Sequence, residues 1–295
     1  MQLSKNNLIF EKGQFIFGKI FCLQHRLLAY KNSTISYYQI GNGPGRVICF
    51  HGYGETGEGF SFLEKPAGDT HTFLAIDLPF HGQTIWKEGL NFSTDDLANI
   101  IKLLLPGEND KQKTINHKLI GFSLGGRIAL SLYELQPQQF SKVVLLAPDG
   151  LKVNSWYWLS TQTWIGNRFF AFTMKYPGWF FGFLQLLNKL KLVNASIFKF
   201  VNFYIGDKQA RENLYNRWTA LRKIKPDLAN IKEAVKKNGS LFRLVYGKHD
   251  RIILSSVGEK FRTGIENNCT ISVIAAGHQV LHEKHAEEIV KALES

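Results

Sequence analysis

Cysteine is scarce in this sequence. Only 3 of the 295 residues are cysteines, and no two of them have C-x-x-C spacing. They are Cys22, Cys49 and Cys269. An odd number without paired spacing is atypical of a disulfide scaffold or a zinc cluster. Because such usage suits a reducing compartment, we expect a cytoplasmic protein.

Long apolar runs are also missing. The sequence has no run of about 18 apolar residues, the length that a transmembrane helix needs. The longest apolar stretch, residues 179–187, is broken by Gly182 and Gln185. Residues 1–21 mix charged and apolar side chains and therefore lack the apolar segment of a signal peptide.

Motifs for cofactors and metals are absent as well. The glycine-rich segment 52–59 lacks the G-K-[ST] ending of a phosphate-binding loop, and we find no cluster with metal-ligand spacing. We therefore expect neither a cofactor nor a metal.

Acidic residues are few in one region only. The chain has 36 Lys and Arg against 24 Asp and Glu, a net charge of +12. Residues 151–240 hold 15 basic and 4 acidic residues, or +11, and the other 205 residues hold 21 and 20, or +1. Nucleic acid, anionic membranes and acidic substrates are the usual partners of basic proteins, but no nucleic-acid-binding motif is present, so we expect no nucleic-acid partner.

Short apolar runs alternate with amphipathic stretches over the rest of the chain. Residues 27–40 have the pattern of a hairpin. Further strands are predicted at 46–50, 72–76, 118–122, 142–147, 241–246 and 270–275, and helices at 94–105, 125–134, 256–265 and 284–293. This alternation predicts an α/β fold, a mostly parallel doubly wound sheet with an N-terminal antiparallel hairpin.

Residues 151–237 interrupt this alternation. They show only helix-like stretches and contain no strand–helix–strand pattern. We predict that residues 1–150 and 238–295 form the core and that residues 151–237 form an inserted helical cap, which is basic and rich in aromatic residues.

One motif carries chemistry directly. Residues 121–125 read G-F-S-L-G, a G-x-S-x-G motif that follows an apolar strand and opens a helix. In that setting Ser123 sits on a tight strand-to-helix turn, where Gly121 and Gly125 leave room that side chains would fill. A serine hydroxyl becomes a nucleophile when a positioned base accepts its proton.

Four further motifs occur in an order that resembles the α/β-hydrolase superfamily, over most of the chain. They are H-G-Y-G at 51–54, D-L-P-F-H-G at 77–82, G-K-H-D at 247–250 and A-G-H at 276–278. The second differs from the usual D-x-P-G-x-G because Phe80 and His81 replace the usual Gly-His or Gly-x. The resemblance implies a serine enzyme with a cap, similar to esterases, lipases and thioesterases.

The resemblance also implies the roles of individual residues. Ser123 is the expected nucleophile, His278 its base and Asp250 the acid that orients the histidine. Asp149 is the alternative acid, because some relatives place it after the preceding strand. The backbone N–H groups of Tyr53 and Leu124 are the expected oxyanion hole.

Substrate contacts are predicted for Gly52, Phe122 and Arg127. Gly125-Gly126-Arg127 resembles the helix of the menaquinone-pathway 2-succinyl-6-hydroxy-2,4-cyclohexadiene-1-carboxylate synthase, in which an arginine would pair a substrate carboxylate. A structural ion pair is the other interpretation of Arg127.

The basic region is also aromatic. Residues 151–240 hold 18 of the 39 aromatic residues, and Phe180, Phe183, Leu184 and Leu187 fall at helical spacing. Three interpretations remain: the rings pack the cap on the core, they form a lid that also lies on an anionic membrane, or the charge attracts an anionic substrate.

Together these features predict a serine hydrolase that acts on a small-molecule ester or thioester through an acyl-enzyme. The alternatives are a pyruvate-eliminating lyase of menaquinone-pathway type, and a non-catalytic binding protein with the same fold.

Overall fold

A single sheet organises the molecule. The computed structural model describes residues 23–105, 116–152, 155–190 and 205–295. In them an eight-stranded sheet has the order β1-β2-β4-β3-β5-β6-β7-β8. The strands are β1 (Leu23–Tyr30), β2 (Ser33–Ile40), β3 (Gly45–Phe50), β4 (His71–Ile76), β5 (His117–Phe122), β6 (Phe140–Leu146), β7 (Leu241–Gly247) and β8 (Cys269–Ile274). The β1–β2 and β2–β4 pairs are antiparallel and the other pairs are parallel, which confirms the predicted sheet and its antiparallel hairpin.

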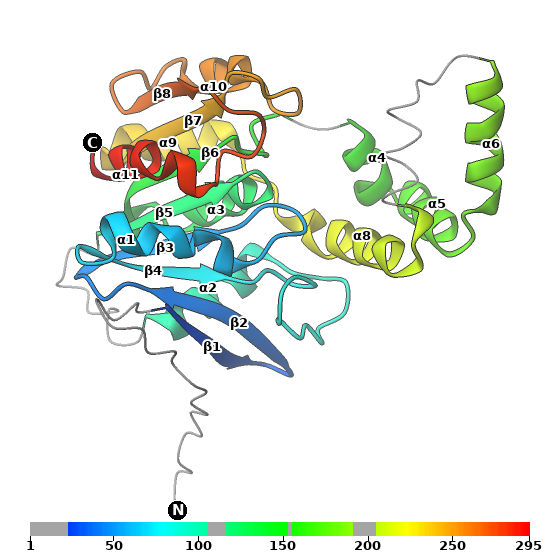
Figure 1. Cartoon of the computed structure of the whole chain (residues 1–295), viewed down its shortest axis with the longest axis horizontal. Helices are drawn as coiled ribbons and strands as arrows, with labels where there is room; N and C mark the ends of the chain where they lie inside the picture. The colour runs from blue at the N-terminus through cyan, green and yellow to red at the C-terminus, as the bar shows by residue number, and fades with distance from the viewer. Residues whose placement is uncertain (1–22, 106–115, 153–154, 191–204) are drawn as a thin grey trace, which may run out of the picture.

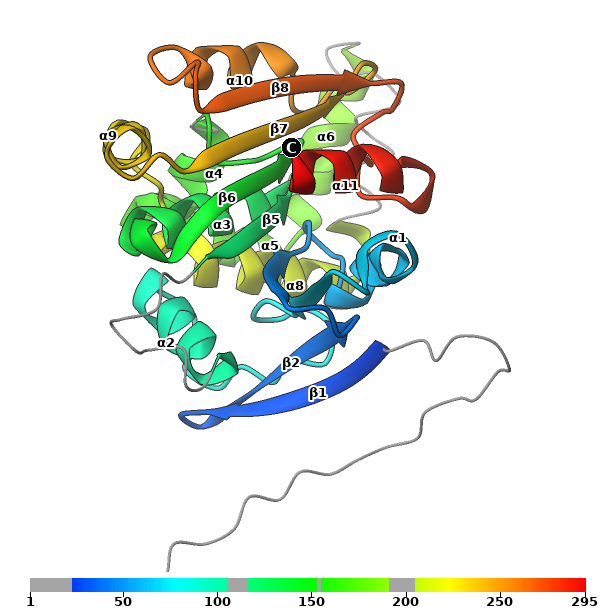
Figure 2. The same ribbon diagram turned by 90° about the vertical axis from the view of Figure 1, so that its left-hand side faces the viewer.

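Helices cover both faces of this sheet (Figure 2). One face carries α2 (Thr94–Leu104), α3 (Leu124–Leu135), α9 (Leu228–Asn238) and α10 (Ser255–Arg262), and the other carries α1 (Glu64–Ala67) and α11 (Ala286–Glu294). The predicted doubly wound arrangement is therefore confirmed.

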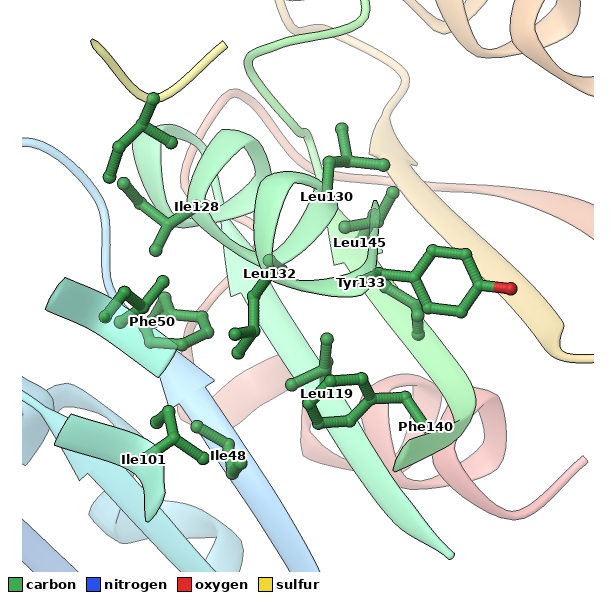
Figure 3. Close-up of a cluster of buried hydrophobic side chains, with 14 of the residues drawn as sticks. Ile48, Phe50, Ile101, Leu119, Ile128, Leu130, Leu132, Tyr133, Phe140 and Leu145 are labelled. Atoms are coloured by element: carbon green, nitrogen blue, oxygen red, sulfur yellow. The ribbon is translucent and has the colours of Figure 1, made fainter. Parts of the chain in front are cut away.

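The pleat of the strands creates two cores. In β3, Ile48 and Phe50 join the buried cluster under α3, whereas Val47 and Cys49 join the cluster under α11. This alternation follows from the two-residue period of a strand, and both sets are apolar because both faces are covered. Figure 3 shows the first cluster, where side chains of α3 such as Ile128 pack against strand side chains.

Local sequence explains where α2 begins. The Ser93 side chain accepts from the Asp96 backbone N–H at 3.1 Å, and the Asp96 carboxylate accepts from the Ser93 backbone N–H at 3.0 Å. This reciprocal pair satisfies two of the N–H groups that a helix start leaves without partners. Asp96 also accepts from the Tyr30 hydroxyl at 2.8 Å, so the cap of α2 holds the hairpin of β1 and β2.

An arm of helices extends from one side of the core between β6 and α9 (Figure 1). We call α4 (Ser155–Gln162), α5 (Trp164–Lys175), α6 (Gly178–Lys189) and α8 (Lys208–Ala220) the arm. The predicted insertion, residues 151–237, also includes most of α9. Ile231 and Val235 of α9 lie in the buried cluster with α3, so this helix belongs to the core layer.

The described helices and cysteines can be compared with what the composition predicts. None of the helices in the described ranges is both long enough and apolar enough to cross a bilayer. Cys49 and Cys269 are buried and free, and Cys22 lies outside the described residues.

Candidate active site

Ser123 occupies the sharp turn between β5 and α3. Its φ of 49° lies in the left-handed region, which is strained for a residue with a side chain. The turn is held by the Ser123 N–H, which donates to the carbonyl of Leu146 at 2.9 Å. A Cβ at Gly121 would overlap the carbonyl of Gly125, and a Cβ at Gly125 would overlap that of Phe50. The two glycines of the motif are thus required by close backbone approach.

Three predicted residues meet at the carboxyl edge of the sheet. The Nε2 atom of His278 lies 3.0 Å from Ser123 Oγ, and its Nδ1 atom lies 2.8 Å from Asp250 Oδ2. Ser123 follows β5, Asp250 follows β7 and His278 follows β8, so the parallel strands bring together residues that are up to 155 positions apart. In such an arrangement the imidazole can accept the proton of the hydroxyl, while the carboxylate orients the ring and stabilises the imidazolium.

Contacts other than that with His278 also hold the carboxylate of Asp250 in place. Its side chain is fully buried, and Oδ1 accepts from the backbone N–H groups of Ile252 at 2.7 Å and Ile253 at 3.0 Å. The remaining oxygen faces His278. The loop that contains Asp250 packs tightly on the loop that contains His278. A Cβ at Gly247 would overlap the carbonyl of Gly277.

The glycine-rich loop after β3 lies against the same site. A Cβ at Gly52 would come within 2.9 Å of the ring of Phe122, the residue before Ser123. Glu55 shapes this loop: Oε2 accepts from the Gly52 N–H at 3.1 Å and Oε1 accepts from the Gln279 side chain at 2.9 Å. One carboxylate therefore joins the loop that contains Tyr53 to the loop that contains His278.

The backbone N–H of Leu124 is, with that of Tyr53, the other group expected at an oxyanion hole. It is the first residue of α3, and the first N–H groups of an α-helix have no intrahelical acceptor. The positive end of the helix dipole adds to their attraction for a developing negative charge.

This arrangement agrees with a family comparison. A sequence model described as the alpha/beta hydrolase fold matches residues 45–284, which is most of the chain. The chain belongs to the α/β-hydrolase fold family. The hydrolase is 26% identical over 262 residues to the uncharacterised hydrolase YugF of Bacillus subtilis (strain 168), covering 84% of this chain and 89% of that relative.

Two partial matches involve named activities. The Mycobacterium tuberculosis (strain ATCC 25618 / H37Rv) esterase Rv0045c is 31% identical over 117 residues, covering 38% of this hydrolase and 36% of the esterase. A Bacillus subtilis (strain 168) protein assigned as a 2-succinyl-6-hydroxy-2,4-cyclohexadiene-1-carboxylate synthase is 33% identical over 109 residues, covering 35% and 36% of the two chains. Both matches span little more than a third of either partner.

The alternative acid has different partners in the hydrolase. Asp149 Oδ1 accepts from the Gly150 N–H at 2.8 Å, and Oδ2 lies 3.5 Å from Arg127 Nε. The Nδ1 atom of His278 is hydrogen-bonded to Asp250 and not to Asp149. The geometry thus favours Asp250 as the partner of the histidine.

Two of the three residues predicted to contact a substrate, Phe122 and Arg127, are buried. The side chain of Phe122 is buried between the glycine-rich loop and His278, and the centroids of the two rings are 5.5 Å apart. Little of this side chain is therefore accessible to a substrate. The Arg127 guanidinium lies beside Asp149 and over the ring of Tyr157 at 4.5 Å. Burial disfavours the charged form of Arg127, but Asp149 and Tyr157 outweigh this and raise its pKa.

His51 has the structural role expected for a buried histidine. Its Nε2 accepts from the Leu78 N–H at 3.1 Å and its Nδ1 donates to the Gly52 carbonyl at 2.7 Å, so the ring is neutral. Burial, with a smaller contribution from the charge of Arg217, lowers the pKa of His51 to about 4. The ring links the loops after β3 and β4.

Sequence reasoning missed Arg217, which comes from the arm. Its Nε donates to the carbonyl of Phe80 at 2.8 Å, and its guanidinium lies 5.2 Å from the ring centroid of Tyr53. Nothing in the local pattern of α8 signals this contact, because it depends on how the arm meets the core. Glu55, in contrast, directly follows the H-G-Y-G motif, and its position beside a glycine-rich turn was an available signal.

Proposed function

We propose that this protein is a serine hydrolase that cleaves carboxylic esters or thioesters through an acyl-enzyme. One observation carries the proposal: His278 lies within hydrogen-bond distance of both the Ser123 hydroxyl and the Asp250 carboxylate. A non-catalytic protein of this fold has no need to keep three such groups aligned on three separate loops. Membership of the hydrolase family and the partial match to an esterase agree with the proposal.

The proposed reaction begins with proton transfer. His278 Nε2 accepts the proton of Ser123 Oγ as the oxygen attacks the acyl carbonyl, and Asp250 stabilises the imidazolium. The N–H groups of Leu124 and Tyr53 stabilise the oxyanion. His278 then returns the proton to the leaving alcohol or thiol, and a water activated by the same histidine releases the acid from Ser123.

A lyase reaction is the second candidate, because one partial relative is assigned as such a synthase. In that alternative the guanidinium of Arg127 would form an ion pair with a carboxylate of the substrate. Here the guanidinium already faces Asp149 and Tyr157, which supports the structural interpretation of this arginine. The hydrolase reaction is therefore the one that we propose.

A panel of substrates tests the proposal. Purified protein is incubated with p-nitrophenyl esters and acyl thioesters of increasing chain length, and separately with the carboxylated ring precursor of the lyase while pyruvate is measured. We expect ester or thioester turnover that Ser123→Ala lowers by at least about 10⁴-fold. Ser272→Ala is the matched control, because Ser272 is an exposed serine on β8. Pyruvate release with negligible ester turnover would favour the lyase, and turnover that survives Ser123→Ala would contradict the nucleophile.

A further inference from the structure

The arm presents an apolar surface on the side of α5 that faces away from its neighbours. The exposed residues of α5 recur at helical spacing, and the apolar ones are Trp164, Ile165, Phe169 and Phe172, followed by Tyr176 just beyond the helix. Ile165 is 74% exposed and Trp164 is 75% exposed. A helix of a globular protein normally buries such a stripe.

The inner side of α5 is already occupied. Asn167 donates to the Thr219 hydroxyl at 3.2 Å, and the ring of Phe170 packs against that of Trp218 in α8 at 5.7 Å. Thr173 is buried on the same side. The outer stripe is thus left over after α5 has packed on its neighbours in the arm.

The next helix continues this surface. In α6 the exposed apolar residues Trp179, Phe183 and Leu186 follow one another at intervals of three or four residues, and Leu190, just after the helix, continues the series. Trp179 contacts Phe169 of α5 with ring centroids 5.1 Å apart, which joins the two stripes. Figure 1 shows α6 at the end of the arm that lies farthest from the sheet. We call the exposed apolar residues of α5 and α6, with Tyr176 and Leu190, the outer stripes.

The outer stripes are large for a free surface. Six of the nine residues are aromatic, with on the order of 150–250 Å² of surface each, and the exposed fractions of the nine range from 41% to 75%. They therefore expose roughly 1,000 Å² of mostly apolar surface, whereas the largest patch on a typical soluble monomer is about 300–600 Å². Such a surface indicates a binding partner.

Charge indicates which partner. Residues 155–190 contain three basic residues, Arg168, Lys175 and Lys189, and no acidic residue. All three are exposed on the same two helices. Two copies that paired through α5 and α6 would bring like charges together, because neither helix has an acidic residue. An anionic lipid surface would meet both the positive charge and the apolar rings.

We propose that the outer stripes bind the surface of an anionic lipid bilayer. Tryptophan, tyrosine and lysine are suited to the interface between head groups and acyl chains. The helices α5 and α6 have 12 residues each, so each is about 18 Å long and lies along the surface instead of crossing a hydrocarbon layer of about 30 Å. This binding is independent of the proposed reaction, since it uses none of the residues around Ser123.

Vesicle co-sedimentation tests the proposal with the full chain. The probes are vesicles of phosphatidylcholine mixed with phosphatidylglycerol, and vesicles of phosphatidylcholine alone. Wild type is expected to sediment with the mixed vesicles and much less with the neutral ones. The double variant Ile165→Glu/Phe183→Glu should lower the affinity at least about tenfold, since it removes apolar contact and adds negative charge. Lys175→Gln should lower binding to mixed vesicles about fivefold.

Matched variants keep the test specific. Leu27→Glu replaces an exposed apolar residue of β1, outside the arm, whose exposed fraction is 58%. This variant should bind vesicles as wild type does. Ser123→Ala should also bind normally, which separates failure of binding from failure of catalysis. Thermal unfolding verifies that each variant is folded. Wild type that binds no vesicle, or binding that the double variant leaves unchanged, would overturn the proposal. A dimer that the double variant dissociates, without vesicle binding, would identify a second copy as the partner.

Discussion

Replacing Asp250 with asparagine is expected to prevent His278 from acting as a base while the fold is retained. Two backbone N–H groups, those of Ile252 and Ile253, donate to Oδ1, and an amide oxygen can accept both. The amide nitrogen of the variant then faces Nδ1 of His278, where the native carboxylate oxygen accepts at 2.8 Å. An NH₂ group can only donate, so it favours the tautomer with the proton on Nε2. That nitrogen can no longer accept the proton of Ser123.

The size of the effect follows from this change of tautomer. A wrong tautomer in a serine, histidine and aspartate arrangement lowers kcat by about 10⁴-fold, which corresponds to about 5.5 kcal/mol in the activation barrier. The assay is kcat for whichever p-nitrophenyl ester the wild type hydrolyses best, with thermal unfolding to verify the fold.

Asp149→Asn is the matched control for Asp250→Asn. Its carboxylate faces Arg127 at 3.5 Å, so we expect the free energy of unfolding to fall by about 1–2 kcal/mol and kcat to stay within about tenfold of wild type. The reasoning is refuted if Asp250→Asn keeps kcat within tenfold of wild type, or if Asp149→Asn loses as much activity.

Two further predictions concern neighbouring groups. Arg217→Gln removes the charged contacts of the arm with Phe80 and with Tyr53 of the glycine-rich loop, and it should lower kcat/KM for esters about tenfold. Lys208→Gln, on the same helix, is the control, and equal activity of the two variants would contradict the role of Arg217. His51 has a folded pKa of about 4, below the value of about 6.5 for an unfolded histidine. Its contribution to stability is therefore complete above about pH 6.5 and is lost as pH falls toward 4, by roughly 3 kcal/mol. Urea unfolding of wild type and His51→Gln at several pH values measures this; parallel pH dependences would show that His51 does not cause it.

The core was predictable because its rules are local. Buried strands such as β5 have apolar runs bounded by turn residues, and helices such as α2 begin at a capping residue. The Ser123 turn was predictable for the same reason, since its glycines are adjacent in the sequence. Asp250 and His278 were found from motifs, and the parallel strands explain why such distant residues meet.

The arm was not predictable to the same degree. The sequence shows that this region is rich in aromatic residues, but not which side of α5 the neighbours occupy. Its polar residue Asn167 and the ring of Phe170 pack inward, whereas Ile165 points outward. Contacts between the arm and the core, such as that of Arg217 with Phe80, depend on tertiary placement. Composition also does not separate α9 from the arm, because α9 is basic like the arm but packs on α3.

The central claim is that the Ser123 hydroxyl is the nucleophile and that His278 activates it. Labelling with a fluorophosphonate tests this claim most directly, because the adduct is stable and its position can be mapped by mass spectrometry of peptides. We expect a single phosphonyl group on Ser123, no labelling of Ser123→Ala, and labelling of His278→Ala that is slower by at least about 10³-fold. Wild type that remains unlabelled, or an adduct that persists in Ser123→Ala, would contradict it.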